Sequence, residues 1–255
     1  ADMRTPMTVG ERANLDAYIA RGGNLLIAGE PRRQEFMNPL VESFGVRFMP
    51  GRLVKKSEHF QPDFIIATPT KEAGEFSYIF NQMIRREYVV TMPGTTGLEC
   101  FEDKGFSITP LFVSDTIGSW NELETTDFVD DTVRLNPAIG EVEKSYPTIV
   151  ALSRKVGNRE QKILLTGDAD CISNEKFSIR RNLRVMTANY TLVTGTFYWL
   201  SDEEAPIDVR RPMGTDNKIH LSRKAMPYLK TACMGIVPAI LLIWGVVLWM
   251  RRKRK

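Results

Sequence analysis

The stretch Thr8–Ala28, TVGERANLDAYIARGGNLLIA, joins a helix signal directly to a buried-strand signal. Thr8 and Glu11 have the spacing of a capping box, in which a hydroxyl and a carboxylate each satisfy a free N–H at the helix start. Gly22-Gly23 supplies the left-handed residue that ends the helix. Asn24–Ala28 then reads as the short apolar run of a strand buried on both faces. This stretch therefore predicts one helix–strand unit of an α/β fold.

Helix and strand signals continue to alternate over the next part of the chain. Helical spacing or strand-like apolar runs occupy, in chain order, Glu35–Phe44, Val46–Met49, Asp63–Thr68, Gly74–Arg86 and Tyr88–Met92. Strands that alternate with helices of this length favour βαβ-type units. We therefore expect an α/β fold in which a mostly parallel sheet is sandwiched by helices. The middle of the chain is less regular, with one clear strand at Ile108–Val113.

Regular patterns return in the last third of the soluble part. Thr148–Ser153 and Lys162–Thr166 flank the turn Gly157–Glu160, which is typical of a β-hairpin. Apolar residues at helical spacing predict a helix over Asn182–Leu200. The polar and proline-bearing stretch Asp202–Asn217 predicts a linker or an edge segment.

Near its end the chain carries an uncharged run, Thr231–Met250, with the sequence TACMGIVPAILLIWGVVLWM. About 20 apolar residues of helix span the hydrocarbon core of a bilayer. A helix buried in the soluble core is the alternative, but such a helix rarely lacks a polar face. The basic residues Arg251–Lys255 follow at once, and positive flanks stay cytoplasmic. We predict one C-terminal transmembrane helix with its tail inside.

This orientation fixes the expected division of the chain. Residues 1–205 form an extracytoplasmic α/β domain, residues 206–230 a juxtamembrane linker, residues 231–250 the transmembrane helix and residues 251–255 a basic cytoplasmic tail. An outside domain must be exported, so we also expect a transmembrane segment upstream of Ala1.

Composition and motifs exclude several classes of function. The 255 residues are 43% hydrophobic and 25% charged with a formal net charge of +3, which is the balance of an ordinary folded protein. No basic stripe is interleaved with aromatic residues, so we expect no nucleic-acid partner. No glycine-rich stretch carries the lysine of a Walker motif, so we expect no ATP hydrolysis by this chain.

Asp168 and Asp170 follow the strand Lys162–Thr166, where strand ends of an α/β sheet open onto a ligand crevice. Paired carboxylates at such a place could bind a divalent cation. The alternative is structural, since aspartates there also cap the next turn by accepting backbone N–H bonds. Ser173-Asn174 likewise reads as a helix start.

The cysteines and histidines give a weaker signal. Cys100 with His59 is the one sequence-level candidate for a nucleophile and its base, although Cys100 lacks the sharp turn that exposes a reactive side chain. Cys100 and Cys171 either form a disulfide in an oxidising periplasm or are separate small buried side chains. His220 lies close to the membrane segment.

Several segments together resemble the auxiliary-component family of bacterial ABC-2-type transporters, which includes the GldG-like gliding-motility proteins. Tyr18–Leu26 is similar to the family's helix running into "GGnLl", and Phe44–Val46 is similar to its "fGv". Pro110–Trp120 is similar to "PLl.Ts..sW". Gly167–Asn174 resembles the signature "GDaDfisN", with Cys171 where the family has an aromatic residue. Asn189 and Trp199-Leu200 fit the helix that follows.

The resemblance implies a periplasmic domain with a glutamine-amidotransferase-like or flavodoxin-like sandwich that lacks the amidotransferase catalytic set. It implies a place in the bacterial inner membrane beside an ABC-2 permease, separate or fused, and through the permease a cytoplasmic ABC ATPase. We expect a non-catalytic binding or scaffolding role, with no cofactor and no metal. Its candidate ligand-binding residues are Asp168, Asp170, Ser173 and Asn174, and Gly235, Ala239 and Gly245 are expected to pack against the permease in lipid.

Two other functions remain open at this point. The first is an amidotransferase-like hydrolase that uses Cys100 or an Asp168/Asp170 site, which requires a perturbed thiol or a bound metal. The second is a periplasmic sugar- or peptide-binding protein that has no transporter partner.

Overall fold

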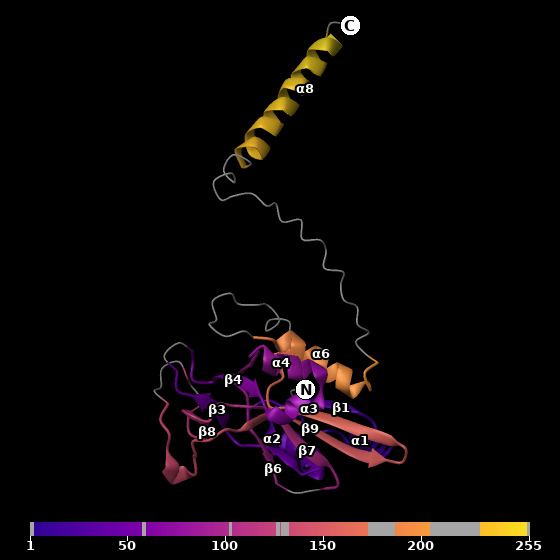
Figure 1. Cartoon of the computed structure of the whole chain (residues 1–255), viewed down its shortest axis with the longest axis vertical. Coiled ribbons are helices and arrows are strands. Elements are labelled where there is room, and N and C mark those ends of the chain that lie inside the picture. Colours follow the sequence, from indigo (N-terminus) through magenta and orange to yellow (C-terminus); the bar gives the residue numbers. More distant parts are fainter. Residues whose placement is uncertain are drawn as a thin grey trace. The chain divides into compact units, whose positions relative to one another are not determined.

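A mixed sheet with the strand order β1-β10-β9-β7-β4-β5 is the centre of the N-terminal part of the chain (Figure 1). The computed structural model describes residues 3–57, 60–101, 104–125, 128, 133–172, 187–204 and 230–253. The strands of this sheet are β1 (Leu25–Ala28), β4 (Phe64–Pro69), β5 (Val90–Pro93), β7 (Ser107–Val113), β9 (Pro147–Val156) and β10 (Arg159–Thr166). The chain divides into two units, Ala1–Ile207 and Asp208–Lys255.

Strand direction differs from the sequence-based expectation. β1 runs parallel to β10, whereas β10/β9, β9/β7, β7/β4 and β4/β5 are antiparallel pairs. The prediction of a mostly parallel sheet is therefore wrong, and this pairing does not support a flavodoxin-like order. The physical reason is that a continuous apolar run reports burial on both faces of a strand but carries no information about its direction.

The predicted hairpin is confirmed. β9 and β10 pair antiparallel from Val156↔Arg159 to Ile149↔Thr166, on either side of the turn at Gly157. Gly157 adopts φ +61°, in the left-handed region that a tight hairpin turn requires and that glycine enters without steric cost.

Helices cover both faces of the sheet, as predicted. Among the described residues, the helices of this unit are α1 (Val9–Ala20), α2 (Gln34–Val41), α3 (Lys71–Phe76), α4 (Tyr78–Arg85) and α6 (Asn189–Leu200), with 3-10 turns η1 (Glu42–Phe44), η2 (Pro137–Ile139) and η3 (Asp170–Ile172). In Figure 1, α4 and α6 lie side by side over one face of the sheet.

Alternate residues of β9 enter two separate cores, one on each face. Ile149 and Ala151 pack with Phe80 of α4 and Leu192 of α6, while Val150 and Leu152 point to the opposite core. That second core contains, from α1, α2 and η1, the buried side chains of Ile19, Met37, Leu40, Val41 and Phe44. The period of two in a strand thus builds the three-layer arrangement.

The local helix signals are confirmed with two changes. The Thr8–Glu11 capping box is present at the start of α1, and Gly45 ends the α2–η1 segment at φ +85°. The helix predicted over Gly74–Arg86 is two helices, because the Ser77 hydroxyl accepts the Ile79 N–H and starts α4 anew. The helix predicted over Asn182–Leu200 is present from Asn189 as α6, whereas Thr187 forms a β-bridge with Val89, and residues 182–186 lie outside the described residues.

Two small antiparallel pairs extend the unit beside the main sheet. β2 (Val46–Phe48) pairs with β6 (Leu98–Cys100), and β3 (Arg52–Lys55) pairs with β8 (Ser119–Glu122). Val54 and Trp120 of the second pair form a small third core with Phe128. Sequence patterns predicted β2 but not β3, β6 or β8, because strands of three or four residues are too short to show a period.

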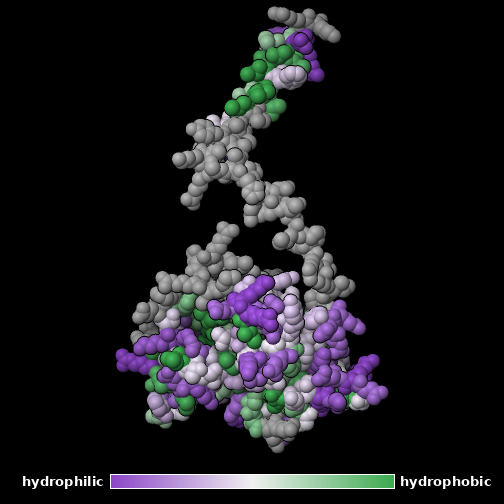
Figure 2. Space-filling view, in the orientation of Figure 1, coloured by the Kyte–Doolittle hydropathy of each residue, from purple (hydrophilic) through white to green (hydrophobic). Residues whose placement is uncertain are grey.

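The second unit contains a long apolar helix, α8 (Val237–Lys253), preceded by a π-helical turn, Ala232–Ile236. Met234–Lys253 is a 20-residue helical stretch that contains an 18-residue window of mean hydropathy 1.9, so it is long and apolar enough to cross a membrane. The π turn lies directly before Pro238, whose ring would clash with the carbonyl four residues earlier in a regular helix. Figure 2 shows the apolar surface along α8 and the hydrophilic residues at its C-terminal end.

Candidate functional site

Two neighbouring strands end in the same two-residue pattern, a glycine followed by an acid. β1 is followed by Gly29-Glu30 and β10 by Gly167-Asp168. Because β1 and β10 are parallel and Ala28 pairs with Thr166, both acids leave the same edge of the sheet at the same level. The expected position of Asp168 at a strand end is therefore present in the structure, with Glu30 beside it.

Glycine is required at both positions because other groups lie too close to the backbone to leave room for a side chain. A Cβ on Gly29 would overlap the ring of Phe48, and a Cβ on Gly167 would overlap the carbonyl oxygen of Thr96. Gly167 is held by two backbone hydrogen bonds: its N–H donates to Thr148 O at 2.8 Å, and its carbonyl accepts from Thr96 N–H at 3.0 Å. The backbone at the base of the site is thus fixed from two sides.

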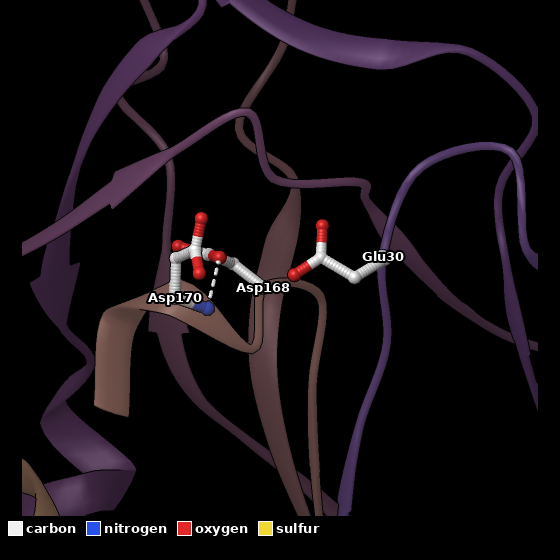
Figure 3. A group of neighbouring side chains, drawn as sticks. All are labelled: Glu30, Asp168 and Asp170. Atoms are coloured by element: carbon white, nitrogen blue, oxygen red, sulfur yellow. Dashed lines mark hydrogen bonds between the residues drawn. The ribbon is translucent and has the colours of Figure 1, made fainter. Parts of the chain in front are cut away.

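Three carboxyl groups converge at this edge (Figure 3). Glu30, Asp168 and Asp170 each offer one carboxylate oxygen, and these oxygens all lie within 4.8 Å of one another. Asp168 is fully buried, Glu30 is half-buried and Asp170 is exposed. The cluster therefore reaches from the protein interior to its surface.

Backbone amides orient two of these side chains. The Asp170 N–H donates to Oδ1 of Asp168 at 2.7 Å, which is the turn-capping bond expected from the sequence. The Ala169 N–H donates to Oε1 of Glu30 at 3.1 Å. The other oxygen of Asp168, Oδ2, is buried and has no hydrogen-bond partner among the described residues.

Burial raises the pKa of Asp168 well above its ordinary value, and the neighbouring carboxylates of Glu30 and Asp170 raise the pKa further. The amide hydrogen bonds from Asp170 and Cys171 act against this shift but do not overcome it. A buried carboxylate facing two acids is stable only with a proton or with a cation beside it.

A buried polar side chain holds α6 to this region. The buried Asn189 accepts hydrogen bonds from the N–H (3.1 Å) and hydroxyl (3.2 Å) of Thr91, and its amide donates to Thr91 O (2.8 Å) and Cys171 O (2.9 Å). A single side chain thus links α6, β5 and the η3 turn, which begins at Asp170.

Neither described cysteine of this unit has the environment of a nucleophile. Cys100 and Cys171 are both free, so the disulfide alternative is not realised. Burial and the charge of Glu99 raise the pKa of the Cys100 thiol, and burial and Asp168 raise that of Cys171. A reactive cysteine needs a lowered pKa. His59, the base considered for Cys100, lies outside the described residues.

The other predicted site residues have separate outcomes. Ser173 and Asn174 lie outside the described residues. Gly235, Ala239 and Gly245 lie on the exposed helical segment of the second unit, and a Cβ at either glycine would meet no atom within 4 Å.

Glu30 is the site residue that the sequence analysis missed. Its signal was present in the repeated pattern of a buried apolar strand, a glycine and an acid, which occurs at Leu25–Glu30 and again at Ile163–Asp168. The pattern could be recognised as a site only by knowing that the two strands are neighbours.

Comparison with known proteins gives one match. The family model described as "ABC-type uncharacterized transport system" matches residues 1–195. No curated protein and no solved structure matches the chain.

Proposed function

Since the chain belongs to this family of ABC-type transport systems, we propose that it is a non-catalytic auxiliary component of an ABC-2-type transporter. The observation that carries the proposal is the combination of the family's domain with α8, a helix whose apolar side chains are exposed along its length. Exposed fractions of 70% at Leu242 and 66% at Trp244 would be costly in water. They favour a lipid environment.

The basic residues at the end of α8 support one orientation. Arg251, Arg252 and Lys253 occupy its last turn, and Lys and Arg are retained on the cytoplasmic side of a membrane. With the tail inside, one crossing puts the α/β domain outside. We therefore place the chain in the bacterial inner membrane with its main domain in the periplasm, and keep a gliding-motility context as a proposal within the same family.

The anchor also offers a means of contacting a permease. Helices in lipid associate through close packing at small residues, since lipid supplies no hydrophobic drive between them. Gly235, Ala239 and Gly245 are such residues, and a Cβ at either glycine would meet no atom within 4 Å. In this proposal the α/β domain contacts substrate, permease loops or an envelope partner, and the cytoplasmic ATPase is reached through the permease.

The thiol environments support a non-enzymatic role. Cys100 and Cys171 have raised rather than lowered pKa values, which disfavours nucleophilic chemistry at neutral pH.

Co-purification from native membranes tests the proposal. A tagged full-length chain, solubilised in mild detergent, is expected to bring down an ABC permease identified by mass spectrometry. Gly245→Leu is expected to reduce the recovered permease severalfold, because its side chain would separate the helices. Val247→Leu is the matched control, since it adds bulk about 200° away around the helix.

Recovery of the chain alone would contradict the proposal and would favour the transporter-independent binding protein. If Gly245→Leu and Val247→Leu reduced the recovered permease equally, Gly245 would have no specific packing role.

A further inference from the structure

The acidic cluster at the ends of β1 and β10 is not accounted for by any role in transporter association. Its three carboxylate oxygens lie within 4.8 Å of one another, and the two strands that carry Glu30 and Asp168 are locked in parallel register. Like charges at such distances repel, and the backbone hydrogen bonds that Glu30 and Asp168 accept do not explain why three acids gather here.

The unsatisfied oxygen of Asp168 is a second and independent observation. Oδ1 of Asp168 already accepts the Asp170 N–H, whereas the fully buried Oδ2 has no hydrogen-bond partner among the described residues. An orphan buried carboxylate oxygen carries a desolvation cost that native proteins normally avoid. Figure 3 shows Asp168 between Glu30 and Asp170, so this side chain points into the cluster.

The donor set has the chemistry of a hard-cation site. Each side chain offers a carboxylate oxygen, and carboxylates are the ligands that Ca²⁺ and Mg²⁺ prefer over softer metals. Oxygens on opposite sides of Ca²⁺ are about 5 Å apart and those of Mg²⁺ about 4 Å apart. The observed limit of 4.8 Å is compatible with both ions.

The surroundings hold the ligands as a cation site requires. Backbone N–H groups of Ala169 and Asp170 fix the Glu30 and Asp168 carboxyl groups, as outer-shell donors do at metal sites. Phe48 packs closely against Gly29, and Thr96 packs closely against Gly167. These contacts hold the ends of the two strands in place. Because Asp170 is exposed, an ion can reach the buried carboxylate of Asp168 from solvent.

We propose that Glu30, Asp168 and Asp170 bind one hard divalent cation, Ca²⁺ or Mg²⁺, between the ends of β1 and β10. The ion balances the three negative charges, satisfies Oδ2 of Asp168 and ties the turn after β10 to β1. The site is structural in this assignment: it sets the shape of the periplasmic surface around the η3 turn. It does not depend on whether the chain associates with a permease.

Titration of the isolated full-length chain tests the assignment. The protein is reconstituted in phosphatidylcholine nanodiscs, treated with EDTA and titrated with CaCl₂ or MgCl₂ by calorimetry, with thermal unfolding followed in parallel. We expect one bound ion per chain, a rise of a few degrees in the unfolding temperature at saturation, and a preference between the two salts that identifies the ion.

Three variants locate the bound ion. Asp168→Asn keeps the shape of the side chain and is expected to weaken binding about tenfold or more. Glu30→Gln is half-buried and retains an oxygen for the Ala169 N–H, so it is expected to fold even if Asp168→Asn does not, with a similar loss of affinity. Glu75→Gln, an exposed acid of α3 outside the cluster, is the control and should bind as the original chain does.

Two results would overturn the assignment. One is the absence of binding heat and of any thermal shift with either salt up to about 10 mM, which is well above the dissociation constant of about 1 mM at the weak end of known calcium sites. The other is unchanged affinity in Glu30→Gln or in a folded Asp168→Asn, which would place the ion elsewhere. Because no permease is present, neither result bears on the proposed transporter role.

Discussion

Replacing Gly167 by alanine should strongly destabilise the α/β domain. The added Cβ would overlap the carbonyl oxygen of Thr96, and it would lie 2.8 Å from Oγ1 of Thr95 and 3.1 Å from the Thr96 carbonyl carbon. Thr95 and Thr96 are fully buried, so neither can turn aside. The backbone of one segment must therefore move.

The size of the effect follows from the contacts that this movement breaks. Gly167 shares backbone hydrogen bonds of 2.8 Å with Thr148 and 3.0 Å with Thr96, each contributing about 1 kcal/mol. Forcing a methyl group into a packed interior costs about 1–3 kcal/mol. We expect the free energy of unfolding to fall by about 3 kcal/mol in Gly167→Ala.

The matched control is the same chemical change at an open site. A Cβ on Gly10, in the first turn of α1, would meet no atom within 4 Å. Gly10→Ala should therefore stabilise the chain by about 0.5–1 kcal/mol, because glycine loses more conformational freedom than alanine when a helix forms.

Urea unfolding of the full chain in nanodiscs, followed by tryptophan fluorescence, measures both variants. The reasoning about the close approach at Gly167 would be refuted if Gly167→Ala unfolded within about 0.5 kcal/mol of the original chain. Equal destabilisation of Gly10→Ala would also contradict it, because a Cβ on Gly10 meets no atom within 4 Å and the cost would then not depend on close contacts.

Two further predictions address α6 and acid stability. Asn189→Ala removes a buried side chain that makes hydrogen bonds of 2.8–3.2 Å to Thr91 and Cys171. Because those groups are left unpaired, the free energy of unfolding measured in urea should fall by about 2–4 kcal/mol. A fall below about 1 kcal/mol would contradict the linking role of Asn189. Lys55 holds the pKa of Asp115 below its ordinary value, so this pair stabilises the fold above the unfolded pKa of aspartate and the contribution is lost as pH falls through the lower folded pKa. Because both side chains are partly exposed, the pair should contribute about 0.5 kcal/mol to the free energy of unfolding at pH 7 and nothing near pH 2. Asp115→Asn should therefore be less stable than the original chain at pH 7 and equally stable near pH 2. The same difference in stability at both pH values would refute the assignment.

Local signals in the sequence predicted most of the fold. The capping box at Thr8, the turn at Gly157 and the apolar run after Gly23 each depend on contacts within a few residues, and each is present. Strand direction was predicted wrongly, because β4 and β5 have the same apolar composition whether they run parallel or antiparallel.

The candidate site was predicted in part for the same reason. Asp168 and Asp170 lie next to each other in the sequence, so their position after a strand could be read directly. Glu30 joins them only because β1 pairs with β10, at a separation of 138 residues that no local pattern encodes. The burial that leaves Oδ2 of Asp168 unsatisfied is likewise a product of tertiary packing.

Cysteine labelling in spheroplasts tests the proposed membrane orientation most directly. Cys100 is exposed on the α/β domain and Cys171 is buried, so a membrane-impermeant maleimide should label Cys100 in intact spheroplasts at pH 8. In a second chain carrying Cys100→Ser and Lys255→Cys, labelling of the tail should require permeabilisation. Labelling of that tail from outside, with Cys100 protected until permeabilisation, would contradict a periplasmic domain held by one C-terminal helix.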